Sequence, residues 1–300
     1  MPNKASPSAA APLLVRLISF NVRFATASPY PGEELWAGRR PKLLAQLNFI
    51  TIGHSSPFIC LQEVLHSQLT DIQAGLGPTW EHIGLGRDDG KTAGEFSPVF
   101  FRSDTWTCTR TQTLWLSETP DIPSKGWDAD LPRVVTVGLF QHKGTGTSVI
   151  VMSTHFDHRG EKARRESAKL LVKLARTWYN DTGGGRDGQP PVFLGGDFNS
   201  TPDGGAYQQI TLPETGMKDV RDLVPKEKRH GNDEITYTSF GGEEKQTRID
   251  FLFTLQSPDV TPRTFAVLPN RFDDGVALSD HRAVVADLEI AIRAWAAHDG

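Results

Sequence analysis

The sequence predicts an α/β sandwich, in which two mixed sheets pack face to face and helices cover the outer faces in an α/β/β/α order. Strand-like segments outnumber helix-like ones, and two long amphipathic segments are interspersed among them. The chain has 300 residues, of which 38% are hydrophobic and 23% are charged. These values are typical of one globular domain that is large enough to bury a core between two layers.

Nine segments are predicted to form strands, because they are rich in β-branched or aromatic residues and are bounded by Gly, Pro or Asp. They are residues 13–20, 58–62, 98–102, 105–116, 133–141, 148–154, 192–195, 248–253 and 282–289.

Two segments are predicted to form long helices, because apolar side chains recur in them at helical spacing. In the segment 34–50 these are Leu35, Leu43, Leu44 and Leu47. The stronger pattern lies in 161–179, where Ala168, Leu171, Leu174, Ala175 and Trp178 share one face and Lys and Arg occupy the other. A short helix is expected after Thr201-Pro202-Asp203.

The expected domain organisation is simple. Residues 1–12 and 292–300 are expected to be tails around a single domain at 13–291, and 182–189 to be a surface loop. Cys60 and Cys108 are the only two cysteines, which favours packed thiols over a disulfide framework or a zinc site. No apolar run has the length of a membrane span. We therefore expect an intracellular, cytoplasmic monomer without a membrane anchor or obligate protein partner, and a nuclear location stays open.

The formal net charge is −4 and the isoelectric point is near 6.1. Such a balance provides no overall attraction to nucleic acid or to acidic lipid. It does not exclude a nuclease, because a local basic groove or a bound metal can hold phosphate while the rest of the surface stays acidic.

Polar residues follow six of the predicted strands, at the point where each apolar run ends or begins. They are Asn21, Glu63, His155 with Asp157, Asp197 with Asn199, Asp250, and Asp280 with His281. Carboxylates gathered at one edge of a sheet repel each other unless a cation or a histidine lies among them. Hard oxygen ligands of this kind suit Mg²⁺ or Mn²⁺ better than zinc.

Each of these motifs has an ordinary structural explanation when it is taken alone. Glu63 could be a solvated strand end, Gly-Gly-Asp197-Phe-Asn199 a turn, and Ser-Asp280-His281 an Asp-capped turn. A lone histidine such as His155 is more often a satisfied core residue than a catalytic one. The functional interpretation depends on all the motifs occurring together, in one order.

The motifs SFN, QEV, STHFD, GGDFN, RIDFLF and SDH resemble, in that order, those of the endonuclease/exonuclease/phosphatase superfamily. The resemblance extends from about residue 13 to about residue 288, and the stretches GEFSPVFFR and WLSETPDIPSKGWDADLPRVVTVGLF resemble a generic microbial and fungal subgroup. It implies the deoxyribonuclease-like four-layer sandwich. It also implies a phosphoester hydrolase that depends on Mg²⁺, for which Mn²⁺ can substitute.

The resemblance also implies roles for individual residues. Glu63 corresponds to the principal metal ligand, with Asn21 beside it, and Asp280 to a further carboxylate at the metal. Asp197 and Asn199 correspond to the pair that positions the attacking water and holds the phosphoryl oxygens.

Two histidines have implied roles of their own. His281 corresponds to the histidine at the scissile phosphate, and Asp250 to the carboxylate that orients its imidazole. His155 corresponds to the second histidine, on the side of the leaving group, and Glu95 to the glutamate that supports it. Whether Asp197 or the Asp250–His281 pair acts as the general base stays open at the level of sequence.

The substrate is less defined than the reaction. Arg133 could clamp a phosphate or could be a strand-edge arginine, and Trp127 could stack on a base or anchor a loop. The Trp-Cys-Asp-Arg signature of the inositol polyphosphate 5-phosphatases is absent before RIDFLF. We expect a phosphodiesterase or nuclease of unspecified preference, for which DNA and RNA are candidate substrates. The alternatives are a phosphomonoesterase for a sugar or inositol phosphate, and a catalytically silent binding module.

Overall fold

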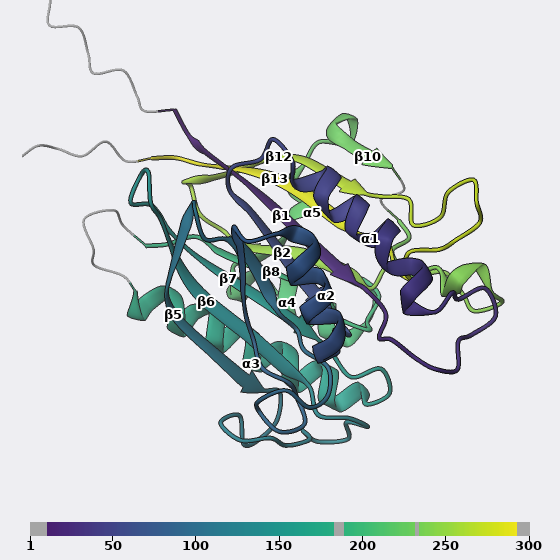
Figure 1. Cartoon of the computed structure of the whole chain (residues 1–300). Helices are drawn as coiled ribbons and strands as arrows, with labels where there is room; N and C mark the ends of the chain where they lie inside the picture. Colours follow the sequence, from purple (N-terminus) through teal and green to yellow (C-terminus); the bar gives the residue numbers. More distant parts are fainter. Residues whose placement is uncertain (1–10, 183–188, 232–233, 293–300) are drawn as a thin grey trace, which may run out of the picture.

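The computed structural model describes residues 11–182, 189–231 and 234–292, and two twisted sheets dominate it (Figure 1). In the described ranges, the first sheet has the order β10 (Arg229–Gly231), β12 (Val260–Val267), β13 (Val284–Ile290), β1 (Leu13–Asn21), β2 (Pro57–Gln62), β4 (Val99–Arg102) and β3 (Trp80–Ile83). The second sheet has the order β5 (Trp106–Trp115), β6 (Val134–His142), β7 (Ser148–His155), β8 (Val192–Asp197), β11 (Asp250–Leu255) and β9 (Met217–Asp219).

Both sheets are mixed. The pairs β1–β2, β10–β12 and β7–β8 are parallel, and the other pairs are antiparallel. This arrangement confirms the predicted pair of packed mixed sheets.

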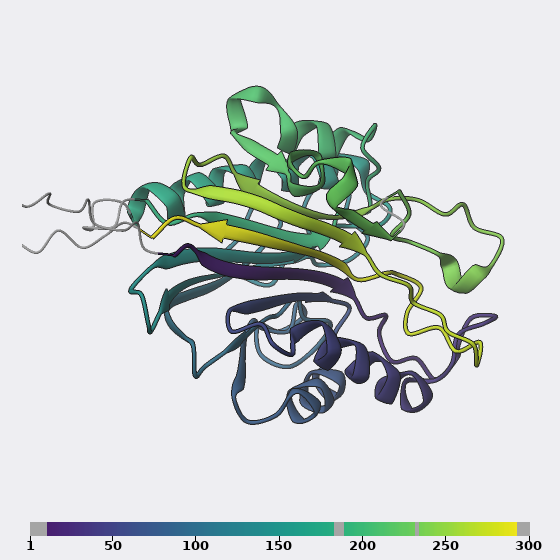
Figure 2. The ribbon, with the colours of Figure 1, turned by 90° about the horizontal axis from the view of Figure 1, so that it is seen from above.

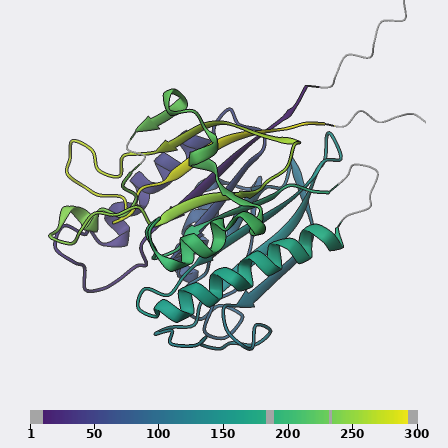
Figure 3. The same ribbon diagram turned by 180° about the vertical axis from the view of Figure 1, so that it is seen from behind.

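Helices cover the outer face of each sheet. Helices α1 (Trp36–Thr51) and α2 (His66–Leu76) lie against the first sheet, and α3 (Glu161–Asp181) and α4 (Gly205–Thr211) against the second (Figure 2). Helix α3 runs across the back of the second sheet (Figure 3). A single turn, α5 (Val220–Leu223), and short 3-10 segments at Pro213–Thr215, Lys226–Lys228 and Ser239–Gly241 complete the helical elements.

Three apolar layers separate the four structural layers. The middle layer lies between the sheets, where Val15, Leu17 and Phe58 meet Val151 and Phe193. Because side chains alternate along a strand, the neighbouring residues Ile18 and Phe20 of β1 point instead toward α1 and α2. Buried side chains of α3 likewise pack on β7, β8 and β11. The predicted α/β/β/α sandwich is therefore the observed fold.

The structure adds several elements that the sequence patterns did not predict, among them α2, β3 and β12. Strand β12 contains Pro262, and its register shifts between Pro262 and Thr264, so its periodicity is broken. Helix α2 begins without a Ser, Thr, Asp or Asn cap, because Leu65 occupies that position and the Gln68 side chain accepts the Leu65 N–H at 3.2 Å.

The predicted tails and the predicted loop lie mostly outside the described residues. Residues 1–10, 293–300 and 183–188 belong to them, and β1 begins at Leu13 as expected. Cys60 and Cys108 are free thiols, and burial between the sheets raises the pKa of Cys60 to about 12. None of the helices in the described part of the chain is both long and apolar enough to span a bilayer.

Candidate active site

The topology explains why the polar strand ends meet at one edge of the sandwich. Strands β7 and β8 are parallel, so their final residues His155 and Asp197 are register partners. Strand β11 is antiparallel to β8, so its first residue, Asp250, also pairs with Asp197. In the other sheet β1 ends at Asn21, which is the register partner of Gln62, the residue before Glu63.

A cavity of about 970 Å³ lies over this edge. Eight of the predicted site residues line it: Glu63, Glu95, Arg133, His155, Asp197, Asn199, Asp280 and His281. Asn21 and Asp250 are fully buried and contact residues of the wall. Trp127 is not among the lining residues; it is half-buried and its backbone N–H contacts Glu118 at 3.2 Å.

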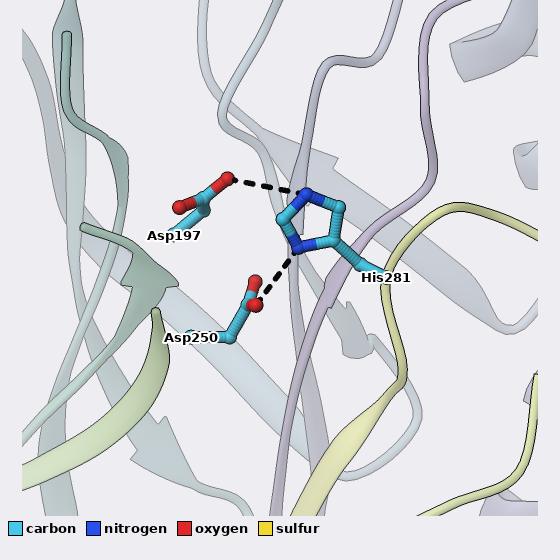
Figure 4. Close-up of side chains that lie close together, drawn as sticks. All are labelled: Asp197, Asp250 and His281. Carbon is cyan, nitrogen blue, oxygen red and sulfur yellow. Dashed lines mark hydrogen bonds and ion pairs between the residues drawn. The ribbon is translucent and has the colours of Figure 1, made fainter. Parts of the chain in front are cut away.

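His281 is held between two carboxylates (Figure 4). Its Nδ1 lies 2.8 Å from Asp250 Oδ2, and its Nε2 lies 3.6 Å from Asp197 Oδ2. Burial disfavours the charged imidazole, but the negative charges of Asp250 and Asp197 outweigh burial and raise the pKa of His281 well above its usual value. This shift favours the imidazolium form of His281, with Nε2 facing Asp197.

Asp197 is poised between its two protonation states near pH 7. Burial, followed by the charge of Asp250, raises the pKa of Asp197 to about 7. Hydrogen bonds from Asn21 Nδ2 at 3.0 Å and from the Asn199 N–H at 2.9 Å fix its two oxygens. A carboxyl group with this pKa matches the requirement for a general base at neutral pH.

The pKa of His155 is shifted in the opposite direction from that of His281. Burial and the positive charges of Arg133 and Arg87 place its pKa well below the usual value, so it is neutral. The Asn199 side chain donates to Nε2 at 3.0 Å, an orientation inferred from the hydrogen-bond network, and the ring proton is then on Nδ1. Among the described residues, Nδ1 has no hydrogen-bond partner.

Glu95 lies beside His155, but Arg87 holds it. The Arg87 guanidinium donates to both Glu95 oxygens, at 2.7 and 2.9 Å, whereas His155 Nδ1 is 3.9 Å from Glu95 Oε2. Burial, with a contribution from the charge of Glu63, raises the pKa of Glu95 to about 7. Sequence reasoning missed Arg87, because it lies in an irregular loop. Its pairing with Glu95 depends on the folded conformation of that loop, which has no periodic sequence pattern.

Glu63 and Asp280 also line the cavity, and the buried Asn21 contacts Glu63 from beneath the lining. Glu63 Oε1 accepts from Asn21 Nδ2 at 3.0 Å, and Glu63 Oε2 accepts the Phe24 N–H at 3.1 Å. Arg23, which sequence reasoning also missed, lies 3.7 Å from Glu63. Burial and the charge of Glu63 raise the pKa of Asp280, although the charge of His281 opposes that shift.

These residues fit a divalent cation. The two carboxylates of Glu63 and Asp280 are close enough to raise the pKa of Asp280, and a hard cation between them would remove that repulsion. Asp197, Asp250 and His281 also each offer a ligand atom, and these atoms lie within 4.8 Å of one another. His281 is hydrogen-bonded to Asp250, and its raised pKa favours a positive charge that would repel a cation. We therefore favour Glu63 and Asp280 as the ligands of the cation.

Two site residues have unusual backbone conformations. Glu63 has a φ of 58° and Asn199 a φ of 45°, in the left-handed region that residues with side chains rarely adopt. Such strain is maintained only when the surrounding contacts determine the position of the residue. Here it directs the Glu63 and Asn199 side chains into the cavity at the points where β2 and β8 end.

Arg133 forms part of the cavity wall and is only 5% exposed. Its Nη2 contacts His158 Nδ1 at 3.1 Å, and its Nε lies 3.6 Å from Asp157 Oδ2. Neither Nε nor Nη1 has a hydrogen-bond partner among the described residues. Buried N–H groups of this kind are costly unless a further acceptor is bound.

The fold and the site together define a metal-compatible phosphoester hydrolase architecture. Residues 18–281 match the model of the Endonuclease/Exonuclease/phosphatase family, and the chain belongs to that family. Its members are phosphoester hydrolases, so this protein is a hydrolase of the same superfamily.

Solved structures of similar proteins agree with this assignment. An endonuclease/exonuclease/phosphatase from Bacteroides vulgatus is 36% identical, with a TM-score of 0.79 over 92% of this chain and 99% of the other. A mannosyl-6-phosphatase from Bacteroides thetaiotaomicron is 31% identical, with a TM-score of 0.78 over 91% of this chain and 99% of the other.

A relative is also found by sequence alone. The uncharacterized protein L388 of Acanthamoeba polyphaga mimivirus is 29% identical over 89 residues, and the match spans 30% of that protein.

Proposed function

We propose that this protein is a Mg²⁺-dependent phosphomonoesterase that releases phosphate from a small phosphorylated metabolite. The observation that carries the proposal is the buried Arg133, which lines the cavity and whose Nε and Nη1 have no hydrogen-bond partner among the described residues. A guanidinium binds terminal phosphate oxygens well, because its N–H groups match them in pairs. The similarity to a mannosyl-6-phosphatase supports the same substrate class.

The charge of the cavity mouth favours a small substrate over a nucleic acid. Three exposed carboxylates line the cavity: Asp130, Glu243 and Glu244. Next to the two glutamates, one exposed cation, Lys245, also lines it. A polyanion would be repelled by this mouth, since nucleic-acid binding depends on neutralising several phosphates. The assay must therefore distinguish the proposed phosphomonoesterase from the phosphodiesterase or nuclease predicted from the sequence.

The residues of the chain divide the work of hydrolysis between them. Arg133 and Asn199 hold phosphoryl oxygens, and the His281 imidazolium donates from Nε2 to charge that develops on them. Asp197, with a pKa of about 7, accepts a proton from the attacking water as the water oxygen bonds to phosphorus. The P–O bond to the leaving group breaks, the departing alkoxide takes a proton from solvent in the cavity, and Asp197 returns its proton to solvent. Because the flanking carboxylates favour the protonated form of His281, we assign the general base to Asp197. Mg²⁺ held by Glu63 and Asp280 supplies Lewis-acid stabilisation of the phosphate charge when it is bound.

A substrate panel tests this proposal. Hexose 6-phosphates, p-nitrophenyl phosphate, bis-p-nitrophenyl phosphate and single- and double-stranded nucleic acids are each assayed with Mg²⁺, Mn²⁺ or EDTA. We expect turnover of the monoesters, its loss in EDTA and its recovery with Mg²⁺ or Mn²⁺. Preference for the diester or for nucleic acid would contradict the proposal in favour of a nuclease. Absence of metal-dependent turnover throughout would favour a binding module.

Arg133 can be tested separately. Arg133→Met keeps the length of the side chain, and we expect it to lower kcat/KM for monoesters by roughly 10²-fold, the effect of removing a charged hydrogen-bond donor. Arg102→Met, at a partly exposed arginine outside the cavity, is the matched control. A folded Arg133→Met protein with the kcat/KM of the control would remove Arg133 from the phosphate site.

A further inference from the structure

One wall of the cavity mouth is an aromatic side chain with no counterpart among the catalytic groups. Tyr30 lines the cavity and is nevertheless 63% exposed. The Arg23 guanidinium lies over the ring, 5.0 Å from its centroid, and also lies 4.2 Å from the centroid of Phe24. A tyrosine that lines a cavity and is this exposed can offer the part of its ring that Arg23 does not cover to a ligand.

The position of Tyr30 is determined by several independent contacts. The Tyr30 N–H donates to Glu33 Oε2 at 3.0 Å, and the Glu33 N–H donates to the Tyr30 carbonyl at 2.9 Å. Glu33 is buried, and its Oε1 lies 3.3 Å from Arg23 Nε. These contacts fix the backbone of Tyr30, and the Arg23 guanidinium packs on its ring, so the ligand has less of the segment to order and the entropic cost of binding is lower.

The same turn lies against a second segment of the cavity lining. Gly32 has a φ of +83°, and a Cβ placed there would lie 3.1 Å from the Phe240 carbonyl oxygen. The Arg271 guanidinium donates to that carbonyl at 2.9 Å. Ser239 and Phe240 both line the cavity and both have a positive φ, of 51°, so this neighbouring segment is strained.

The segment from Tyr237 to Glu244 carries hydrogen-bond acceptors at the cavity. Tyr237, whose ring packs 5.1 Å from that of His281, donates its hydroxyl hydrogen to Glu244. Glu243 and Glu244 line the cavity, and Asp130 lines it from another loop. Apart from the residues proposed to bind phosphate, the cavity lining thus combines the exposed ring of Tyr30 with several carboxylates.

This combination fits a ring that carries many hydroxyl groups. The C–H face of such a ring packs on an aromatic surface, and its hydroxyls donate to carboxylate oxygens. A leaving group with further phosphates would instead be repelled by the three carboxylates. We propose that Tyr30 is a specificity-determining residue, which binds the polyhydroxylated leaving group of a sugar phosphate by stacking. This inference rests on the proposed phosphomonoesterase function and assigns the part of the site that selects the substrate.

The test compares binding of the whole substrate with binding of phosphate alone. Tyr30→Ala and Tyr30→Phe are prepared with Phe49→Ala, which removes an aromatic side chain that is 78% exposed and lies outside the cavity lining. For each protein, KM is measured for a hexose 6-phosphate, and Ki is measured for inorganic phosphate, the product that every monoester shares. Thermal unfolding checks that each variant is folded.

We expect Tyr30→Ala to raise KM for the hexose phosphate by roughly three- to tenfold, the effect of one aromatic contact, while Ki for phosphate stays within twofold. Tyr30→Phe should recover most of the lost affinity, because it keeps the ring. An unchanged KM in Tyr30→Ala would overturn the inference and leave the proposed function standing. Equal changes in KM and Ki would also overturn it, because Tyr30 would then act through the phosphate site. Absence of monoesterase activity in the wild type would overturn the proposed function itself.

Discussion

Two buried histidines of the same site are tuned in opposite directions by their neighbours. His281 lies between Asp197 and Asp250, and His155 lies in the positive field of Arg133 and Arg87. Burial alone would make both neutral, so the difference comes from the charges around each ring. Pairs of titratable groups whose environments separate their pKa values define the acid and base roles of a site.

The first residue-scale prediction concerns Asp250. Asp250→Asn removes the charge that holds His281 protonated, and we expect kcat to fall by roughly 10²- to 10⁴-fold while the fold persists. His281→Ala should have a similar effect. Asp104→Asn, at a partly exposed carboxylate distant from the cavity lining, serves as the control for steady-state assays. Turnover close to that of the control in folded His281→Ala protein would remove His281 from the mechanism.

The second residue-scale prediction concerns Asp157, which organises the loops beside Arg133. Its carboxylate accepts backbone N–H groups of Asp130, Leu131, Arg159 and Gly160. Burial works against the charged form, but these hydrogen bonds dominate and lower the pKa of Asp157. A folded-state pKa below the unfolded value of about 3.9 stabilises the protein above that pH, and the effect is lost as the pH falls through the folded pKa.

Asp157→Asn should therefore reduce the free energy of unfolding by roughly 1–3 kcal/mol at pH 7, and the difference from wild type should shrink below about pH 4. Urea denaturation at several pH values measures it. Asp121→Asn, at an exposed position, provides the matched control. A difference that stays constant from pH 7 to pH 3 would contradict the linkage.

At the scale of elements, helix α1 connects two segments of the site, one that carries Asn21 and one that carries Asp280. Arg39 is fully buried in α1, and its guanidinium donates to the carbonyls of Val22, Leu278 and Arg23. Val22 follows Asn21, and Leu278 precedes Ser279 and Asp280 in sequence. The helix thus positions two chain segments that are far apart in sequence but adjacent at the site.

Arg39→Met is expected to reduce the free energy of unfolding by roughly 3–5 kcal/mol, because the carbonyls lose a buried charged partner. Arg40→Met is the matched control. The Arg40 side chain is 43% exposed and pairs with Asp71, so its loss should cost less than about 1 kcal/mol. Equal stability of the two variants in urea denaturation would show that Arg39 does not support this junction.

At the scale of the whole molecule, the seam between the sheets depends on a small residue. A Cβ placed at Gly195 in β8 would lie 3.0 Å from Cys60 Cβ and 3.2 Å from Cys60 Sγ in β2. The close approach of these strands brings the ends of β2 and β8 together, and with them Glu63 and Asp197.

Gly195→Ala should therefore overpack the seam and reduce the free energy of unfolding by roughly 1–3 kcal/mol. Cys60→Ala removes the sulfur from the same contact, so the double variant should be less destabilised than the sum of the single variants. Urea denaturation of all four proteins closes the double-mutant cycle. Strict additivity would indicate that the two residues do not share this contact.

The sequence predicted the sandwich and the chemistry of its edge, since alternation along each strand and the abrupt polar ends are local patterns. Strands such as β1 and β8 and helix α3 were located within a few residues. The interrupted β12 and the poorly capped α2 were not, because their local signals are weak and contacts with the rest of the fold stabilise them.

The sequence by itself determined which residues end the strands, because a polar residue that follows an apolar run can be recognised from the local pattern. It therefore predicted a site rich in carboxylates, amides and histidines. Only the tertiary structure decided which charges surround each histidine, that Arg87 holds Glu95, and that Tyr30 and Glu243 line the same cavity. The physical reason is that charge states and cavity walls depend on distances between segments remote in sequence, and these distances are fixed by the packing of the two sheets.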